Sequence, residues 1–153
     1  MQNHFDLLRI TRNNVLKNVE GLSLEILNTI PAGFNNNLAW NLGHLPATQQ
    51  LLCYGLSGNQ MLLENEFINR YRKGTRPEQD IDQAELDFIK SKLIIFSDKL
   101  EEDYNNQLFK EFRTYTTSYE TTLTSVEDAI IFNNLHEAMH LGYILAIKRA
   151  LKL

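Results

Sequence analysis

The sequence has little that could build a disulfide framework, a secretory leader or a nucleic-acid-binding surface. Cys53 is the only cysteine among 153 residues, so no internal disulfide can form and a reducing compartment is indicated. The net charge of -4 argues against general affinity for nucleic acid. The N-terminal MQNHFDLLRI lacks the basic and apolar regions of a signal peptide. We therefore expect a cytoplasmic protein.

Long hydrophobic runs are missing as well. The most apolar segment, residues 129–150, is interrupted by five polar residues: Asn133, Asn134, His136, Glu137 and His140. This composition is typical of a buried helix in a bundle and not of a membrane span. No membrane partner is expected.

Four segments carry apolar residues at the three- and four-residue spacing of an amphipathic helix. Pro31 and Gly33 are expected to end the first of them. The expected bounds are Phe5 to Ile30, Asn37 to Gly55–Gly58, a segment that follows Asp82, and Ser125 almost to the C-terminus. This pattern predicts an all-α four-helix bundle that forms a single domain over residues 1–153.

Two long connections, residues 59–81 and 106–124, separate the last three helices. The second is rich in Thr, Tyr and Phe, which favours extended structure or a short hairpin. Because both are too long to be tight turns only, at least one of them is expected to cross the bundle.

The fourth helix contains the most informative motif, His136-Glu137-Ala138-Met139-His140. Histidines four residues apart lie on one face of a helix, so both imidazoles can bind one metal ion. The motif also matches the H-E-x-x-H signature of zinc proteases, in which the glutamate is the general base. Residues 141–153 contain no His, Glu, Asp or Cys to serve as the downstream third ligand. A zincin-type peptidase is therefore not expected.

The same motif contains Glu137-x-x-His140, which is half of the site found in di-iron carboxylate bundles. Such a site needs a second Glu-x-x-His on another helix. At that spacing His4 is preceded by Met1, and His44 is preceded by Asn41. A di-iron site is therefore not expected either.

His44 is the best upstream candidate for a third ligand. Gly43 lowers helix stability relative to alanine, which suggests that another segment approaches the backbone closely there. Pro46 cannot donate a hydrogen bond to the carbonyl of Leu42 and should kink the helix beside His44. A kink that serves packing alone, with a hydrogen-bonded His44, stays open as the alternative.

The motifs W-x-L-G-H-L at residues 40–45 and H-E-A-M-H-L-G at residues 136–142 lie about 90 residues apart. Together they resemble the DinB/YfiT-like superfamily, and the resemblance covers nearly the whole chain. It implies a four-helix bundle of up-down-down-up connectivity that binds one divalent metal ion, most often zinc or nickel. Carried over by motif, the ligands are His44, His136 and His140. Histidine ligation is also compatible with iron and copper.

The resemblance further implies a metal-dependent transferase or hydrolase that acts on a small electrophile, because characterised relatives use low-molecular-weight thiols. Two alternatives stay open: a non-catalytic metal-binding or stress-related bundle, and a helical dimer whose histidines are structural. We expect a homodimer, because the resemblance points to one and because outer apolar residues such as Leu62, Leu63 and Phe67 need cover.

Three further residues are expected near the metal ion. Asn133 shares the helix face of His136 and His140 and could orient a bound water or a substrate carbonyl. Trp40 lies one turn before His44, and Tyr143 lies almost one turn after His140. Both are expected mainly to pack and to wall the pocket.

Arg12, Glu137 and Cys53 have simpler expected roles. Arg12 interrupts the apolar stripe of the first helix and is expected to extend toward the end of the bundle, with anion binding as the alternative. Glu137 is expected to form an ion pair at the surface or between helices, or else to contact the metal ligands. Cys53 is expected to be a buried apolar thiol.

Overall fold

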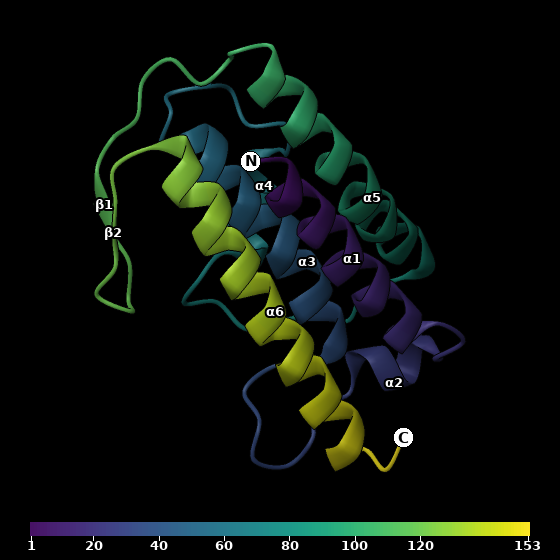
Figure 1. Cartoon of the computed structure of the whole chain (residues 1–153). Helices are drawn as coiled ribbons and strands as arrows, with labels where there is room; N and C mark the ends of the chain where they lie inside the picture. Colours follow the sequence, from purple (N-terminus) through teal and green to yellow (C-terminus); the bar gives the residue numbers. More distant parts are fainter.

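The computed structural model describes residues 1–153 and is mostly helical, with one two-stranded hairpin, which agrees with the predicted all-α class. Four long helices pack side by side (Figure 1), and none of the helices is both long and apolar enough to cross a membrane. The long helices are α1 (Gln2–Val19), α3 (Leu38–Gln49), α5 (Gln83–Asn105) and α6 (Val126–Ala150). The π-helix η1 (Gln50–Gly55) extends α3 directly.

The short elements lie in the connections. Helix α2 (Leu24–Asn28) follows α1, and α4 (Asn65–Tyr71) lies between α3 and α5. The predicted hairpin is present: β1 (Tyr115–Thr116) and β2 (Thr122–Leu123) pair antiparallel, with Tyr115 opposite Leu123. The hairpin lies beside the first half of α6 (Figure 1).

Three of the long helices begin where the sequence predicts. The side chains of Asn37, Asp82 and Ser125 each accept a hydrogen bond from a backbone N–H in the first turn of α3, α5 and α6, at 2.8, 2.8 and 3.2 Å. These caps satisfy N–H groups that have no partner within the helix.

The predicted length of the first helix is wrong. Helix α1 ends at Val19, Glu20 is extended, and Gly21 has a φ of +71° that turns the chain into α2. The apolar spacing continues across this break because Leu22 and Ile26 pack against the same core as α1. The apolar spacing therefore predicts correctly that these residues pack on the core, but it wrongly predicts one uninterrupted helix.

The bundle core is divided into two apolar clusters. Helices α1 and α3 each pack against both α5 and α6. One cluster includes Val15 and Ile144, and the other, at the opposite end of the bundle, includes Phe5 and Leu100. Between the clusters, every long helix contributes a buried polar residue. We call this set the polar layer: Arg12, Gln49, Ser97, Asn133 and Glu137.

Arg12 and Glu137 form an ion pair at the centre of the polar layer. Arg12 is 1% exposed and Glu137 is 0% exposed, and Nε and Nη2 of Arg12 donate to the Glu137 carboxylate at 2.9 and 2.6 Å. Arg12 also donates to Gln49 Oε1 at 3.1 Å, to the Leu93 carbonyl at 3.1 Å and to Ser97 Oγ at 3.4 Å. The expectation that Arg12 extends to the bundle end is wrong, whereas Glu137 does form an interhelical ion pair.

Replacing Arg12 by methionine should strongly destabilise the fold. Glu137 would then be a buried charge without a partner, and such losses typically cost about 3–5 kcal/mol of unfolding free energy. The double variant Arg12→Met/Glu137→Leu should recover much of this loss, because it removes both charges. Denaturant unfolding measures both variants.

Arg9→Met is the matched control. Arg9 lies on α1 as well, but its side chain is 31% exposed and its partners Asp6, Asp98 and Glu101 lie near the surface. Exposed ion pairs contribute about 0–1 kcal/mol, so this variant should change stability by less than about 1 kcal/mol. Equal losses in the Arg12 and Arg9 variants would contradict the role assigned to the polar layer.

Candidate metal centre

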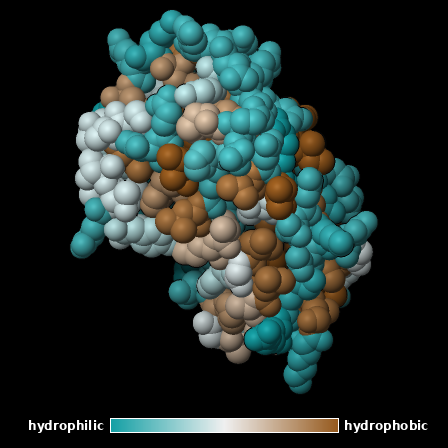
Figure 2. All heavy atoms as spheres, in the orientation of Figure 1, coloured by the Kyte–Doolittle hydropathy of each residue, from teal (hydrophilic) through white to brown (hydrophobic).

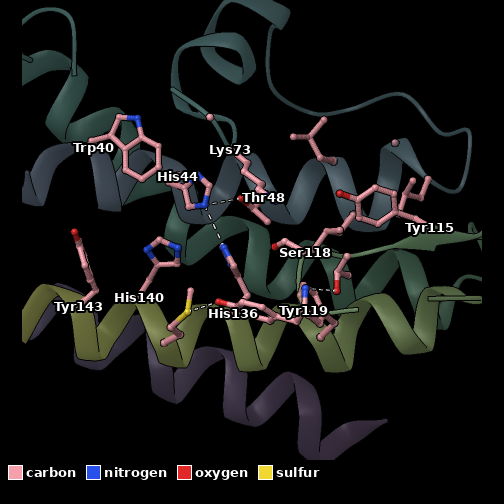
Figure 3. A pocket seen from close by; sticks show the side chains of 18 of the residues that line it. Trp40, His44, Thr48, Lys73, Tyr115, Ser118, Tyr119, His136, His140 and Tyr143 are labelled. Carbon is pink, nitrogen blue, oxygen red and sulfur yellow. Dashed lines mark hydrogen bonds between the residues drawn. The ribbon is translucent and has the colours of Figure 1, made fainter. Parts of the chain in front are cut away.

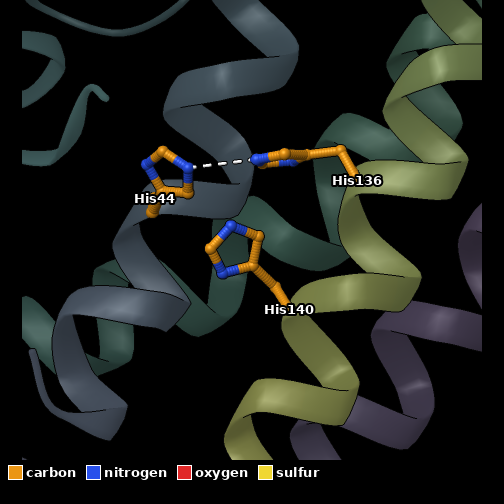
Figure 4. A group of neighbouring side chains, drawn as sticks. All are labelled: His44, His136 and His140. Carbon is orange, nitrogen blue, oxygen red and sulfur yellow. Dashed lines mark hydrogen bonds between the residues drawn. The ribbon is translucent and has the colours of Figure 1, made fainter. Parts of the chain in front are cut away.

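Three histidines from two helices meet on one side of the bundle (Figure 4). His44 projects from α3, and His136 and His140 project from neighbouring turns of α6. One ring nitrogen of each lies within 4.8 Å of the others, and Nε2 of His44 is 3.1 Å from Nε2 of His136. Nitrogens that bind one tetrahedral ion at about 2.0–2.1 Å are themselves about 3.3 Å apart. Small side-chain rotations would therefore bring these three to one ion.

Hydrogen bonds set the protonation of two of the rings. Nδ1 of His44 donates to the Tyr71 carbonyl at 2.6 Å, and Nδ1 of His140 donates to Asn41 Oδ1 at 2.8 Å. Because a carbonyl oxygen can only accept, each Nδ1 carries the hydrogen and each Nε2 keeps its lone pair. This is the usual way in which a protein orients a histidine that binds metal.

The surroundings keep the imidazoles neutral. Burial lowers the pKa of all three rings. For His136 and His140 the neighbouring histidines lower the pKa further, to about 2 and about 3. A neutral imidazole is the form that binds metal. Nδ1 of His136 is buried and has no hydrogen-bond partner. The donor set therefore fits a divalent ion.

Contacts from the 59–81 connection hold His44 in place. A Cβ at Gly43 would lie 2.5 Å from the Tyr71 ring, so glycine permits the close approach that brings the Tyr71 carbonyl to His44. The Trp40 indole stacks on the His44 ring with centroids 4.5 Å apart, and its Nε1 donates to Thr75 Oγ1 at 3.0 Å. The close approach predicted from Gly43 is therefore confirmed.

The three histidines open onto a pocket of about 620 Å³. Figure 3 shows Trp40 and Tyr143 at one end, the histidines and Thr48 along the middle, and Tyr115 at the other end. The hairpin and the 59–81 connection complete the walls. Other residues that line the pocket include Leu51, Leu56, Met61, Lys73, Arg113, Tyr119, Phe132 and Met139.

Not every residue expected at the site is there. Trp40 and Tyr143 line the pocket, as expected, but Asn133 does not. Asn133 is 0% exposed, and its Nδ2 donates to Glu137 Oε1 at 2.9 Å, so it belongs to the polar layer. Cys53 is buried, and burial raises the pKa of its thiol to about 12, which agrees with an inert core residue.

Sequence reasoning missed the partners of the histidines. Tyr71 and Asn41 orient His44 and His140, and Thr75 holds Trp40. The apolar spacing of Phe67, Ile68 and Tyr71 in the 59–81 connection is the one sequence signal for α4. A one-turn pattern of this kind is too short to be distinctive.

A family model described as the DinB superfamily matches residues 7–144. The chain belongs to the DinB superfamily. Among solved structures, it resembles a crystal structure of a conserved protein of locus from Enterococcus faecalis. The two share 13% sequence identity with a TM-score of 0.65, over 97% of this chain and 95% of that one. This likeness shows a shared fold. No curated protein matches the sequence.

The stability of this DinB protein without metal should fall as the pH falls from 7 to 5. Unfolded histidines bind protons below a pKa of about 6.5, whereas the three site histidines stay neutral in the folded state because burial lowers their pKa. Protons therefore favour the unfolded state, by up to about 1.4 kcal/mol per pH unit for each histidine. Denaturant unfolding across this range measures the slope.

Two variants provide the comparison. His136→Gln removes one buried histidine and should reduce the slope, whereas His4→Gln, outside the site, should leave it unchanged. Stability that is independent of pH between 7 and 5 would contradict the assignment of three neutral imidazoles.

Proposed function

We propose that this DinB protein is a divalent-metal-dependent enzyme that transfers a low-molecular-weight thiol to a small electrophile or hydrolyses that electrophile. One observation carries the proposal: three neutral imidazoles, from His44, His136 and His140, converge on the wall of a pocket large enough for a small molecule. Pockets of about 300–1,000 Å³ are typical of small-molecule sites.

The number of protein ligands, together with the pocket beside them, supports a catalytic metal ion over a structural one. A structural zinc site is closed by four protein ligands, whereas three ligands leave a position open. A divalent ion held in this way supplies Lewis acidity, which lowers the pKa of a coordinated thiol or water. Among the chain's own residues, the Thr48 hydroxyl oxygen lies 3.2 Å from His44 Nε2, the atom that would hold the ion, and Tyr143 presents a phenol to the same pocket. Both are placed to orient a small molecule.

Glu137 is not available as the general base of a peptidase. Its carboxylate points into the core and is held by Arg12 and Asn133. The H-E-x-x-H motif therefore supplies two metal ligands and one structural residue, and peptidase activity is not proposed.

Zinc and nickel are the metals proposed first, with iron and copper also compatible with histidine ligands. Imidazole is a suitable ligand for all four ions, although their intrinsic affinities differ in the Irving–Williams order. Metal supply in the cell then determines which ion is bound.

We further propose a single domain of up-down-down-up connectivity. Both apolar clusters draw on α1, α5 and α6, which supports one continuous unit. In Figure 1, α1 and α6 run in one direction while α3 and α5 run in the opposite one.

A cytoplasmic homodimer completes the proposal. Figure 2 shows hydrophobic side chains grouped over α1 and α6. The exposed apolar residues of these helices include Leu7, Ile10, Ile131, Leu135 and Leu145. This face supports a dimer better than the residues expected from the sequence. Of those, Leu62 is exposed, but Leu63 is buried and Phe67 packs on Tyr71 and Phe88.

The protein purified without a histidine tag should contain about one metal ion per chain, and His140→Ala should lose it while remaining folded. Two remaining imidazoles cannot close the site, whereas the apolar core does not depend on His140. Elemental analysis measures the metal, and metal-reconstituted protein is then assayed with low-molecular-weight thiols and halogenated or epoxide acceptors.

His4→Ala is the control, because His4 lies outside the cluster. Turnover by the reconstituted protein that disappears in His140→Ala supports the enzyme. Turnover unchanged in that variant would contradict metal-dependent catalysis. Metal binding with no turnover for any pair would favour the alternative, a non-catalytic metal-binding bundle.

A further inference from the structure

The pocket beside the histidines has a charge opposite to that of the whole chain. Asp and Glu outnumber Lys and Arg by 19 to 15 in the sequence, yet no Asp or Glu lines the pocket. The two charged residues that line it, Lys73 and Arg113, are both cations. Because the three imidazoles are neutral, these two side chains are the charged groups that the protein itself places on the pocket wall.

Lys73 and Arg113 have no partners within the protein. Neither side chain forms an ion pair, although Arg9, Arg12, Arg70 and Lys99 all do. Neither donates a hydrogen bond from its side chain to another residue. Both cations are therefore free to bind a ligand, and no Asp or Glu on the pocket wall competes for them.

Each cation comes from one of the two long connections. Lys73 follows α4, in the segment that also provides the Tyr71 carbonyl for His44, and it lies near His44 and Thr48 in Figure 3. Arg113 precedes the hairpin. Its backbone N–H donates to the Leu56 carbonyl at 2.7 Å, which holds the chain just before β1 against the end of η1.

The rest of the pocket wall is suited to bind the apolar part of a ligand. Aliphatic side chains from η1 and the segments beside it form one part, and aromatic rings from the hairpin and α6 form another. The apolar and aromatic residues away from the Trp40 and Tyr143 end of the pocket are Leu51, Leu52, Leu56, Met61, Tyr115, Tyr119, Phe132 and Met139.

We propose that Lys73 and Arg113 form an anion-recognition pair and that this pocket takes an organic acid, with a carboxylate on an apolar or aromatic body. The inference rests on the proposed function, because it names the class of small molecule presented to the three-histidine site. Guanidinium and ammonium groups both bind carboxylates, and the guanidinium does so in a bidentate manner.

Matched acid and amide probes test the pair. The full-length protein, stripped of metal with a chelator, is titrated with dansylglycine and with dansylglycinamide, and the fluorescence of each is followed. A smaller pair, 4-phenylbutyrate and 4-phenylbutyramide, is measured by calorimetry. The acid of at least one pair should bind about tenfold more tightly than its amide, and 0.5 M salt should remove most of that preference, because screening weakens exposed charge interactions.

The double variant Lys73→Gln/Arg113→Gln should lose the preference for the acid while it binds the amide as the natural protein does. The control is Arg72→Gln/Lys110→Gln, which removes two exposed cations that do not line the pocket. Arg72 is adjacent to Lys73 in sequence, but its Nε donates to Asn69 Oδ1. This control should keep the preference.

Equal affinity for acid and amide in both pairs, or no binding of either acid, overturns the proposal. A preference for the acid that the Lys73/Arg113 variant keeps also overturns it. The same holds if the variant prefers the acid only after metal is restored, because the metal and not the two cations would then bind the carboxylate. Metal content separates this failure from failure of the proposed function. The Lys73/Arg113 variant should retain metal, whereas a natural protein without metal contradicts the three-histidine site.

Discussion

The buried ion pair between Arg12 and Glu137 is the contact on which the arrangement of this bundle depends. Removing two charges from water costs several kcal/mol for each ion, so the pair persists only where further polar groups satisfy it. Gln49, Ser97 and the Leu93 carbonyl complete the donors of Arg12. Sliding or rotating any long helix would break one of these bonds. The polar layer therefore fixes the relative position of all four.

That constraint also determines where the histidines point. Neighbouring residues of a helix project about 100° apart, so a Glu137 held toward Arg12 directs His136 and His140 to the side of α6 that faces α3. His44 is held separately, by the Tyr71 carbonyl and the stacked Trp40 ring. The two halves of the site thus have independent supports, one in the core and one in the 59–81 connection.

Local signals in the sequence predicted much of this structure. Asn37, Asp82 and Ser125 are capping residues, and a cap acts within one turn of its own helix. The pair His136 and His140 depends on helix geometry alone, and sequence reasoning therefore placed it on one face correctly. The break after Val19 was missed because apolar spacing continues on both sides of Gly21.

Features that depend on tertiary contacts could not be read in this way. Arg12 and Glu137 are 125 residues apart, and nothing local distinguishes a buried arginine from one that reaches solvent. Asn133 shares a helix face with the histidines, but its amide turns to Glu137 because the polar layer lies at its level. Tyr71 acts through its backbone carbonyl, which every residue has, so its side chain gave no sign of that role.

X-ray absorption spectroscopy of the metal-loaded protein tests the central claim most directly, because it reports the atoms that surround the ion. The account predicts three imidazole nitrogens at about 2.0–2.2 Å, with at least one further ligand atom, an oxygen from solvent or a sulfur from an added thiol. A spectrum with fewer than three imidazoles, or with a shell closed entirely by protein ligands, would contradict it.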